Sequence, residues 1–189
     1  PDKIVFSGVG KREDEMKFAL EQNIKCFNVE SRSELTTLSK VAKNMKLVAP
    51  VSLRVNPDVD AKTHPYIATG LKENKFGIAF ESAKDIFKQA ENDNSIKLIG
   101  IDCHIGSQIS ELSPFQDALR KIFDLIGELG ELGIILKHVD IGGGLGISYK
   151  DEVGFALNIG FDYVLSENNY FNIDIKKYDL STDVVVDAG

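Results

Sequence analysis

Cysteine is scarce in this chain, and basic residues do not outnumber acidic ones. The 189 residues include two cysteines, Cys26 and Cys103, and each lies in an apolar run with no CxxC or other paired spacing. This excludes a disulfide framework and indicates buried thiols in a reducing compartment. The formal net charge of −7 argues against a nucleic-acid surface, which needs clustered Lys and Arg.

Long apolar runs are also missing. The sequence has no stretch of 18 apolar residues and no basic-then-apolar leader, so we expect a cytoplasmic protein without a membrane-inserted segment. With 43% hydrophobic and 27% charged residues, the composition predicts a folded domain with a sizeable core and not a disordered chain. The chain opens at Pro1 and enters an apolar run at once, so we expect it to begin inside a domain.

Short apolar runs alternate with amphipathic segments. The runs are rich in Val, Ile and Phe, which is typical of strands buried on both faces of a parallel sheet. The segments between the apolar runs are predicted to be helices: one follows Lys11, two begin at the capping-box sequences 31–34 and 113–116, and one has a weaker start at Ser82. The predicted strands are residues 4–9, 25–29, 51–55, 98–103 and 138–141.

Repeated βα units predict an α/β fold, either an open doubly wound sheet or a closed (β/α)8 barrel. Chemically distinctive residues follow the carboxyl ends of different strands, and only a barrel brings all of those ends to one rim. We therefore predict a TIM barrel, incomplete because five strands are too few. Those residues are Ser7, Gly8, Glu30, Ser31, Arg54, Asn56, His104, Ser107 and Gly142 to Gly144.

The pattern weakens beyond Asp151. Residues 153–159 are compatible with a helix, and residues 161–178 are mixed and rich in Asn and Asp. Residues 184–189 (VVVDAG) predict one more buried strand.

Three consecutive glycines, Gly142, Gly143 and Gly144, follow a predicted buried strand directly. Glycine costs backbone entropy, so this run implies a positive φ or the close approach of another group. Bare backbone amides that bind a phosphate would explain it, and a tight turn that only redirects the chain is the alternative. The run is not a GxGxxG dinucleotide fingerprint, because no long helix with clear periodicity follows it at once.

His104 and Arg54 are the other candidate site residues. His104 could be a general base, a metal ligand, a ring stacked on an aromatic cofactor, or a core histidine. Neighbours on a strand point to opposite faces, so we do not expect Asp102, Cys103 and His104 to form a metal cluster. Arg54 lies in an apolar strand, where a charge needs a partner. It could bridge to Glu30 as a structural ion pair or lie beside a bound anion or ring, and Ser107 could hydrogen-bond a phosphate oxygen.

Seven segments, in order and with family-like spacing across roughly residues 1 to 150, resemble diaminopimelate decarboxylases. The loop NPDVD…THPYI.TG separates that family from its ornithine- and arginine-decarboxylating relatives. The segments are IVFSGVGK (4–11), FNVES (27–31), LRVNPDVD (53–60), THPYIATG (63–70), KFGI (75–78), HIGSQ (104–108) and DIGGGLGI (140–147).

The resemblance implies an alanine-racemase-like barrel that binds pyridoxal 5'-phosphate, with residues 1–150 as that domain. Residues 151–189 would be the end of the barrel or the start of a β-domain, and they could be discontinuous with the rest. The implied reaction is decarboxylation of meso-2,6-diaminopimelate to L-lysine, a carboxy-lyase step of lysine biosynthesis, in a cytoplasmic homodimer. The implied cofactor contacts are Gly142, Gly143 and Gly144 with Ser107 at the phosphate, His104 on the pyridine face and Arg54 near the ring, with no metal.

Two parts of the family pattern have no counterpart here. The lysine that carries the cofactor as a Schiff base would precede Pro1, and Lys11 and Lys75 stand in the wrong context. The Glu-Pro-Gly-Arg segment is also absent. We therefore expect the 189 residues alone to be inactive. Two alternatives to the prediction of an enzyme are a non-catalytic homologue that binds pyridoxal phosphate and a barrel fragment that binds nothing.

Overall fold

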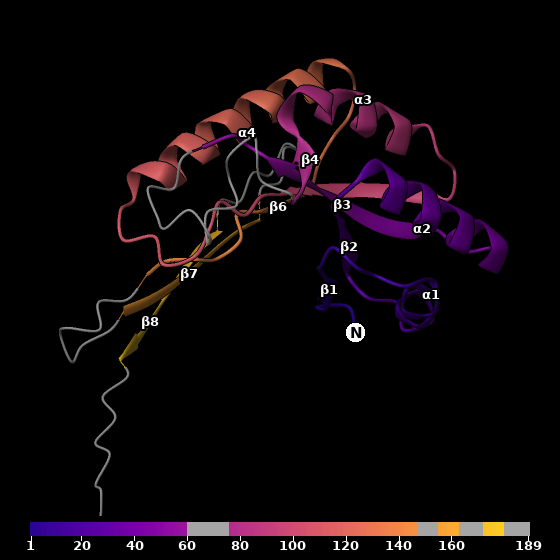
Figure 1. The fold of residues 1–189 in the computed structure, drawn as a ribbon, viewed down its shortest axis with the longest axis horizontal. Helices are drawn as coiled ribbons and strands as arrows, with labels where there is room; N and C mark the ends of the chain where they lie inside the picture. Colours follow the sequence, from indigo (N-terminus) through magenta and orange to yellow (C-terminus); the bar gives the residue numbers. More distant parts are fainter. Residues whose placement is uncertain (60–75, 147–154, 163–171, 180–189) are drawn as a thin grey trace, which may run out of the picture.

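A curved, mostly parallel sheet organises the chain. The computed structural model describes residues 1–59, 76–146, 155–162 and 172–179, and Figure 1 shows the helices on one side of the sheet. The parallel part has the strand order β1-β2-β3-β5-β6, and β4 pairs with β3. These strands are β1 (Val5–Phe6), β2 (Cys26–Val29), β3 (Ala49–Asn56), β4 (Ile78–Ala79), β5 (Ile96–Asp102) and β6 (His138–Asp140). The helices are α1 (Glu13–Glu21), α2 (Arg32–Met45), α3 (Phe80–Glu91) and α4 (Ser113–Glu131).

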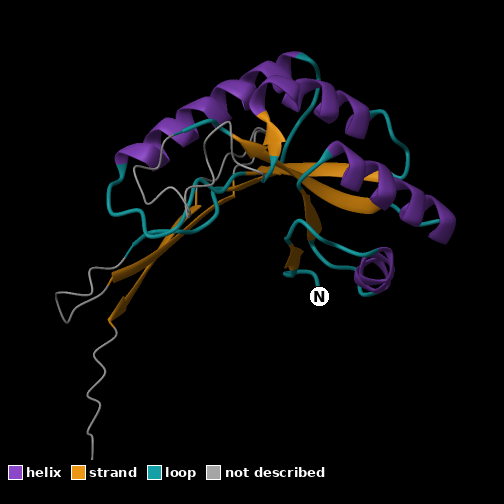
Figure 2. Cartoon of the chain, viewed as in Figure 1, coloured by secondary structure: helices purple, strands orange, loops and turns teal. Residues whose placement is uncertain are grey.

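A strand is found within each of the five predicted runs, but the run at 4–9 forms only the two residues of β1, and β3 and β5 each begin two residues earlier than predicted. Each predicted helix follows its strand (Figure 2). Helix α2 begins as predicted, because the Ser31 hydroxyl accepts the Glu34 amide at 3.1 Å. The predicted start of α4 is wrong by one position: Leu112 is the N-cap and Ser113 is already helical. Pro114 suits the first turn, where an amide is not needed, so the helix extends in front of it. Helix α3 likewise starts before Ser82, at Phe80.

The two faces of the parallel strands have opposite character. Phe27, Leu53 and Ile101 are fully buried in the apolar core between sheet and helices. Their neighbours along the strands point to the other face, because side chains alternate on a strand. On that concave face the buried residues include polar and charged ones: Asn28, Glu30, Ser52 and Asp102.

The end of the described chain departs from the barrel pattern. Strands β7 (Phe155–Asp162) and β8 (Asn172–Asp179) pair antiparallel in register, and β7 also runs antiparallel to β6. The expectation of a helix over 153–159 is therefore wrong for the residues described there. Phe155, Leu157, Ile159 and Phe161 recur at every second position in the sequence, which is the period of a strand. The strand predicted at 184–189 lies outside the described residues.

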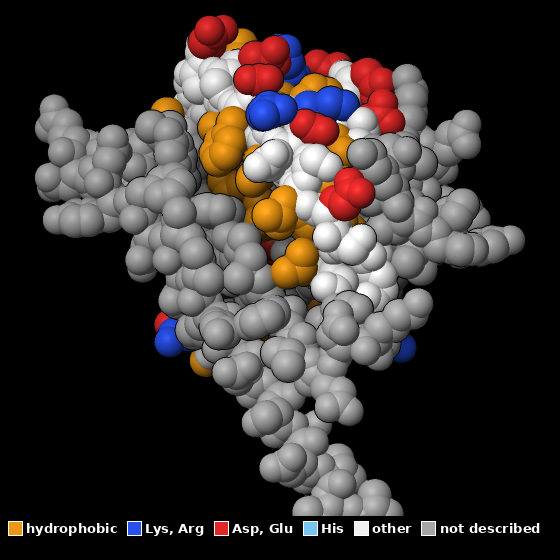
Figure 3. All heavy atoms as spheres, turned by 90° about the vertical axis from the view of Figure 1, so that its left-hand side faces the viewer, with side chains coloured by type: hydrophobic (Ala, Val, Ile, Leu, Met, Phe, Trp, Pro, Cys, Tyr) orange, Lys and Arg blue, Asp and Glu red, His pale blue; other side chains and the backbone are white. Residues whose placement is uncertain are grey.

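The parallel, curled sheet with helices on one side confirms the predicted α/β class and an incomplete (β/α)8 barrel. Both cysteines are free and buried, as predicted, and burial raises the pKa of the Cys26 thiol to about 11. Across the described ranges, no helix combines the length and apolar character needed to cross a membrane. On the face drawn in Figure 3, acidic and basic side chains are interspersed above an apolar area.

Candidate functional site

Charged side chains lie in a row across the carboxyl ends of three adjacent strands. Parallel pairing sets Arg54 of β3 beside Asp102 of β5, and Asp102 beside Asp140 of β6. These residues share the concave face, and Glu30 extends the row just past the end of β2. Of the residues that the sequence predicted to meet at strand ends, this row contains Glu30 and Arg54; Asp102 and Asp140 were not in that set.

Arg54 forms the structural ion pair that the sequence suggested. Its Nη1 donates to Glu30 Oε2 at 2.9 Å, and its Nε lies 3.9 Å from Asp102 Oδ2. The guanidinium also lies 5.9 Å from the centre of the Phe76 ring. The side chain of Arg54 is only 14% exposed, so its charge is balanced mainly by Glu30 and not by bulk water.

Lys11 is occupied in a different ion pair. Its side chain is 1% exposed, and Nζ donates to Glu34 Oε1 at 2.7 Å, to the Gly8 carbonyl at 2.6 Å and to the Asn28 carbonyl at 2.7 Å. An ammonium group has three protons to donate, so all of them are used. Lys11 is therefore a structural residue in this arrangement and not a free amine, in agreement with the expectation that it stands in the wrong context. Lys75 lies outside the described residues.

The triple glycine is divided in its backbone requirements. Gly142 and Gly144 have φ of 69° and 103°, which favour glycine, whereas Gly143 does not adopt a positive φ. A Cβ on Gly142 would lie 2.6 Å from His104 Nδ1, and one on Gly144 would overlap the Gly106 carbonyl oxygen. A Cβ on Gly143 would meet no atom of the described residues within 4 Å. Two of the glycines therefore serve the fold, and the middle one has an open side among the residues that the structure describes.

The loop that contains Ser107 lies against the glycine loop. The Ile109 amide donates to the Gly144 carbonyl at 2.8 Å, and the Gly146 amide donates back to the Ile109 carbonyl at 2.8 Å. Ser107 itself is exposed. The structure thus brings together the two segments that the sequence assigned to a phosphate, although they are 35 or more residues apart in the chain.

The His104 ring contacts the same loop. Its Nδ1 accepts the Gly143 amide at 3.3 Å, so the neutral ring carries its proton on Nε2. Burial lowers the pKa of His104, with a further contribution from the nearby Arg54 cation, while Asp140 and Glu30 act in the opposite direction. A neutral, half-buried imidazole is suited to stacking or to hydrogen bonding and not to carrying a positive charge.

Asp102 is the most perturbed carboxyl group of the row. It is 5% exposed, and burial, reinforced by Asp140, raises its pKa to about 8. Arg54 acts in the opposite direction but does not compensate for burial. Asp102 is therefore mostly protonated at neutral pH, which lowers the negative charge around any anion that binds here.

These features fit an anionic aromatic ligand. The open side of Gly143 and the exposed Ser107 leave room and donors for a phosphate, and the His104 ring lies beside them. One departure from the predicted loop concerns its amides: Gly142 donates to Asp140 Oδ1 at 2.8 Å, and Gly143 donates to His104. The Gly143 bond is long at 3.3 Å, so an anion with a full charge would compete for that amide.

The sequence assigned no role toward a ligand to three residues of the site. Glu30 appeared as the possible partner of Arg54, Asp102 was considered only for a metal, and Lys11 was set aside. The signal for Lys11 and Glu30 was present in the capping box, because Glu34 of that box accepts from both the Lys11 ammonium and the Glu30 amide. No local sequence pattern predicts the protonation of Asp102, because it depends on burial between the neighbouring strands β3 and β6.

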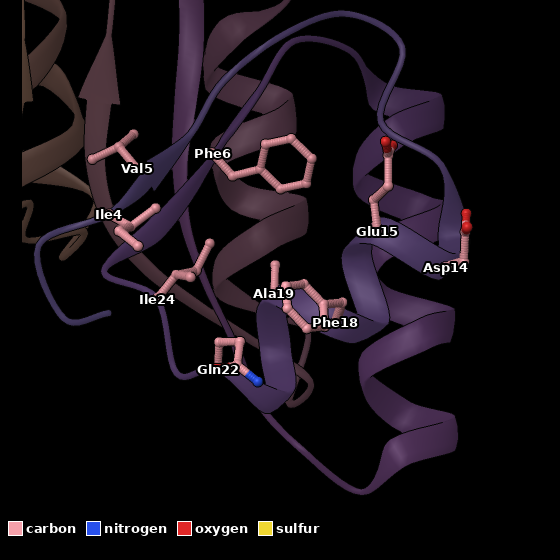
Figure 4. A pocket seen from close by; sticks show the side chains of 9 residues that line it. All are labelled: Ile4, Val5, Phe6, Asp14, Glu15, Phe18, Ala19, Gln22 and Ile24. Carbon is pink, nitrogen blue, oxygen red and sulfur yellow. The ribbon is translucent and has the colours of Figure 1, made fainter.

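A separate pocket lies between β1 and α1, away from the predicted site residues. Figure 4 shows Phe6 of β1 and Phe18 of α1 among its lining residues, with Ile4 and Ile24 close by. Its lining is mainly apolar, and Phe18 is 64% exposed. No residue assigned to the cofactor belongs to it.

A glycine-rich loop, a neutral histidine and an arginine lie at the carboxyl rim of a parallel half-barrel, an arrangement that fits a cofactor-binding barrel domain. The chain belongs to the family "pyridoxal-dependent decarboxylase, pyridoxal binding domain", whose model matches residues 1–161. A second family model, that of the OmpW family, matches residues 137–189 and overlaps the first.

Curated relatives are diaminopimelate decarboxylases. The chain is 56% identical to that of Pseudomonas aeruginosa over 152 residues, which are 80% of this chain and 37% of the relative. It is 47% identical to that of Aquifex aeolicus over 152 residues, 80% of this chain and 36% of the relative. The chain thus spans little more than a third of the length of the curated relatives it matches.

Solved structures that resemble this chain are also decarboxylases. The diaminopimelate decarboxylase of Helicobacter pylori, complexed with L-lysine, has a TM-score of 0.76 at 45% identity and matches 78% of this chain and 37% of its own. Lysine decarboxylase from Selenomonas ruminantium has a TM-score of 0.61 at 28% identity, over 72% of this chain and 33% of its own. A structure of SrLDC in complex with PLP and cadaverine has the same TM-score of 0.61.

Proposed function

We propose that residues 1–146 form the part of a pyridoxal-phosphate decarboxylase that holds the phosphate and one face of the cofactor ring. The observation that carries the proposal is the open side of Gly143, beside His104 and against the Ser107 loop. Gly142 and Gly144 are needed by the backbone, but the fold does not require a glycine at 143. A ligand that approaches closely does.

Each residue has a distinct task in this proposal. The Gly143 amide and the Ser107 hydroxyl would donate to phosphate oxygens, and the neutral His104 ring would contact the ring of the cofactor. Arg54 holds a positive charge near the ring. Pyridoxal phosphate, when bound, supplies an electron sink for the electron pair left at a carbon that loses its carboxylate. The residues of this chain bind and orient it.

For the whole protein we propose decarboxylation of meso-2,6-diaminopimelate to L-lysine and CO2. The identity to diaminopimelate decarboxylases supports this substrate more than it supports lysine or ornithine, because the lysine decarboxylase match is at 28%. We also propose a cytoplasmic homodimer and a cofactor domain that ends near residue 150. The change from parallel to antiparallel pairing between β6 and β7 supports that boundary.

A graft tests the substrate. Residues 1–146 would replace the matching segment of the Pseudomonas aeruginosa relative, and CO2 release would be measured with meso-diaminopimelate, L-lysine, L-ornithine and L-arginine. We expect turnover with meso-diaminopimelate alone. A grafted enzyme that folds, shows the visible absorbance of bound cofactor and prefers another amino acid would refute the proposed substrate.

Gly143→Val in the grafted enzyme tests the phosphate contact. Losing one or two charge-assisted hydrogen bonds, each about 1.5–3 kcal/mol, should weaken cofactor affinity by roughly tenfold to twenty-thousand-fold. The measurement is titration of the apoenzyme with pyridoxal phosphate. Gly130→Val is the matched control, because Gly130 lies in α4 and a Cβ there also meets nothing within 4 Å. Equal affinity in both variants would refute a contact between Gly143 and the cofactor.

A further inference from the structure

Glu30 connects two loops and a strand at the rim. Its Oε1 accepts the Gly8 amide at 3.1 Å, and its Oε2 accepts Arg54 Nη1 at 2.9 Å. The Glu30 side chain is 3% exposed. One carboxylate therefore joins the turn after β1 to the charged side chain of β3, and neither of its oxygens is free to rotate into solvent.

Glu30 is in turn fixed by the beginning of α2. Its own amide donates to Glu34 Oε2 at 3.0 Å, and Glu34 Oε1 accepts Lys11 Nζ at 2.7 Å. Lys11 donates to the Gly8 carbonyl as well, at 2.6 Å. These bonds close a ring through Gly8, Glu30, Glu34 and Lys11, so the position of the Glu30 carboxylate is determined from both sides.

Arg54 needs such a partner more than the other arginines do. Arg12, Arg32 and Arg120 bond to side chains at the exposed surface, where water replaces a lost contact. Arg54 is largely buried, and its second acidic neighbour, Asp102, lies at 3.9 Å, beyond hydrogen-bond distance. The direction of the guanidinium is therefore set by Glu30.

We propose that Glu30 is the positioning residue of the site: it holds the Arg54 guanidinium at one place on the rim, between Glu30 and Asp102. The statement about Arg54 geometry stands on the contacts above, and only its use toward the cofactor ring rests on the proposed function. An amide at position 30 would still accept from Gly8, but it would remove the charge that holds Arg54.

The experiment uses the full 189-residue chain labelled with nitrogen-15, with arginine side-chain signals recorded by NMR. The sequence contains four arginines, and three of them serve as internal references for exposed side chains. In the unchanged chain we expect resolved Arg54 Nη–H signals with slow rotation and slow exchange, and averaged signals from Arg12, Arg32 and Arg120. Arg54 signals that average like the other three would overturn the proposal without any variant.

Glu30→Gln should then collapse the resolved Arg54 signals into the averaged form while the backbone spectrum stays dispersed. Glu128→Gln is the matched control, because it also removes one carboxylate from an ion pair, the exposed one with Lys84. Resolved Arg54 signals in a folded Glu30→Gln chain would refute the positioning role. If Glu30→Gln does not fold, the unchanged chain still decides the matter through its Arg54 exchange rates.

A second measurement separates this inference from the proposed function. In the grafted enzyme, Glu30→Gln should weaken pyridoxal phosphate binding by roughly tenfold or more, the loss of about one charge-assisted contact. Inorganic phosphate, which has no ring, should bind equally well to both forms. Loss of Arg54 order with unchanged cofactor affinity would uphold the Arg54 geometry and refute its use toward the ring. Equal loss of affinity for both ligands would show that Glu30 only supports the fold.

Discussion

Two neighbouring glycines should differ strongly in how much the same substitution destabilises the fold. Gly144→Ala adds a Cβ at φ of 103° that would overlap the Gly106 carbonyl oxygen, whereas Gly143→Ala adds a Cβ that meets nothing within 4 Å. Because the obstructing atom in the first case belongs to the backbone, it cannot move by a rotamer change. The two loops that exchange hydrogen bonds through Gly144 and Ile109 would have to separate.

The expected magnitudes follow from separate contributions. Placing Ala in the left-handed half of φ space costs about 1–2 kcal/mol, and forced backbone displacement adds roughly 1–3 kcal/mol. Gly144→Ala should therefore lower the free energy of unfolding by about 2–5 kcal/mol. Gly143→Ala should change it by less than about 1 kcal/mol, and could raise it, since Ala restricts the unfolded chain.

Urea unfolding of the 189-residue chain, followed by circular dichroism, measures both values. In thermal unfolding, the Gly144→Ala loss corresponds to a Tm lower by roughly 5–15 °C for a domain of this size. Equal destabilisation by the two substitutions would refute the reasoning, because it would mean that Gly143 is also required by the backbone. The proposed cofactor contact would then lose its main support.

Three further predictions concern the buried charges. Burial raises the pKa of Asp102 to about 8, so the folded chain retains a proton that the unfolded chain releases above about pH 4. The free energy of unfolding should therefore fall by up to about 1.4 kcal/mol for each pH unit between about pH 4 and about pH 8. Urea unfolding of Asp102→Asn at several pH values should lack this decline. The lowered pKa of His104 means that its ring should titrate below 6.5 in NMR, with stability lost on acidification below that pH; titration at or above 6.5 would contradict the burial argument. Lys11→Met leaves the Glu34 carboxylate, which is 10% exposed, without its cation, and should lower the free energy of unfolding in urea by about 3–5 kcal/mol. The double variant Lys11→Met with Glu34→Gln should lose less. A double variant as unstable as the single one would show that the two side chains are not coupled.

The sequence predicted the features that depend on local pattern. Val51 to Val55 reads as a buried strand from its own residues, and Ser31 reads as a helix cap from its spacing to Glu34; both are found. The meeting of the His104 and Gly143 segments was also predictable, because parallel strands bring their carboxyl ends to one edge. Their roles toward a cofactor remain predictions.

What the sequence could not supply depends on contacts between distant segments. The role of Lys11 requires knowing that Gly8, Asn28 and Glu34 converge, and the protonation of Asp102 requires knowing that Asp140 lies beside it. The need for glycine at 144 but not at 143 comes from the position of the Gly106 carbonyl. The strand at 155–162 was missed for another reason: its period of two was present in the sequence but was interpreted as helical.

The reversal of direction at β6 sets a limit on how the sheet grows. One edge of β6 pairs with β5, and β7 pairs with β6 at Val139 in the opposite direction. A strand has two hydrogen-bonding edges, so a further parallel strand that joins the sheet at β6 must compete with β7 for the second one. A parallel strand can therefore pair with that edge of β6 only by displacing β7.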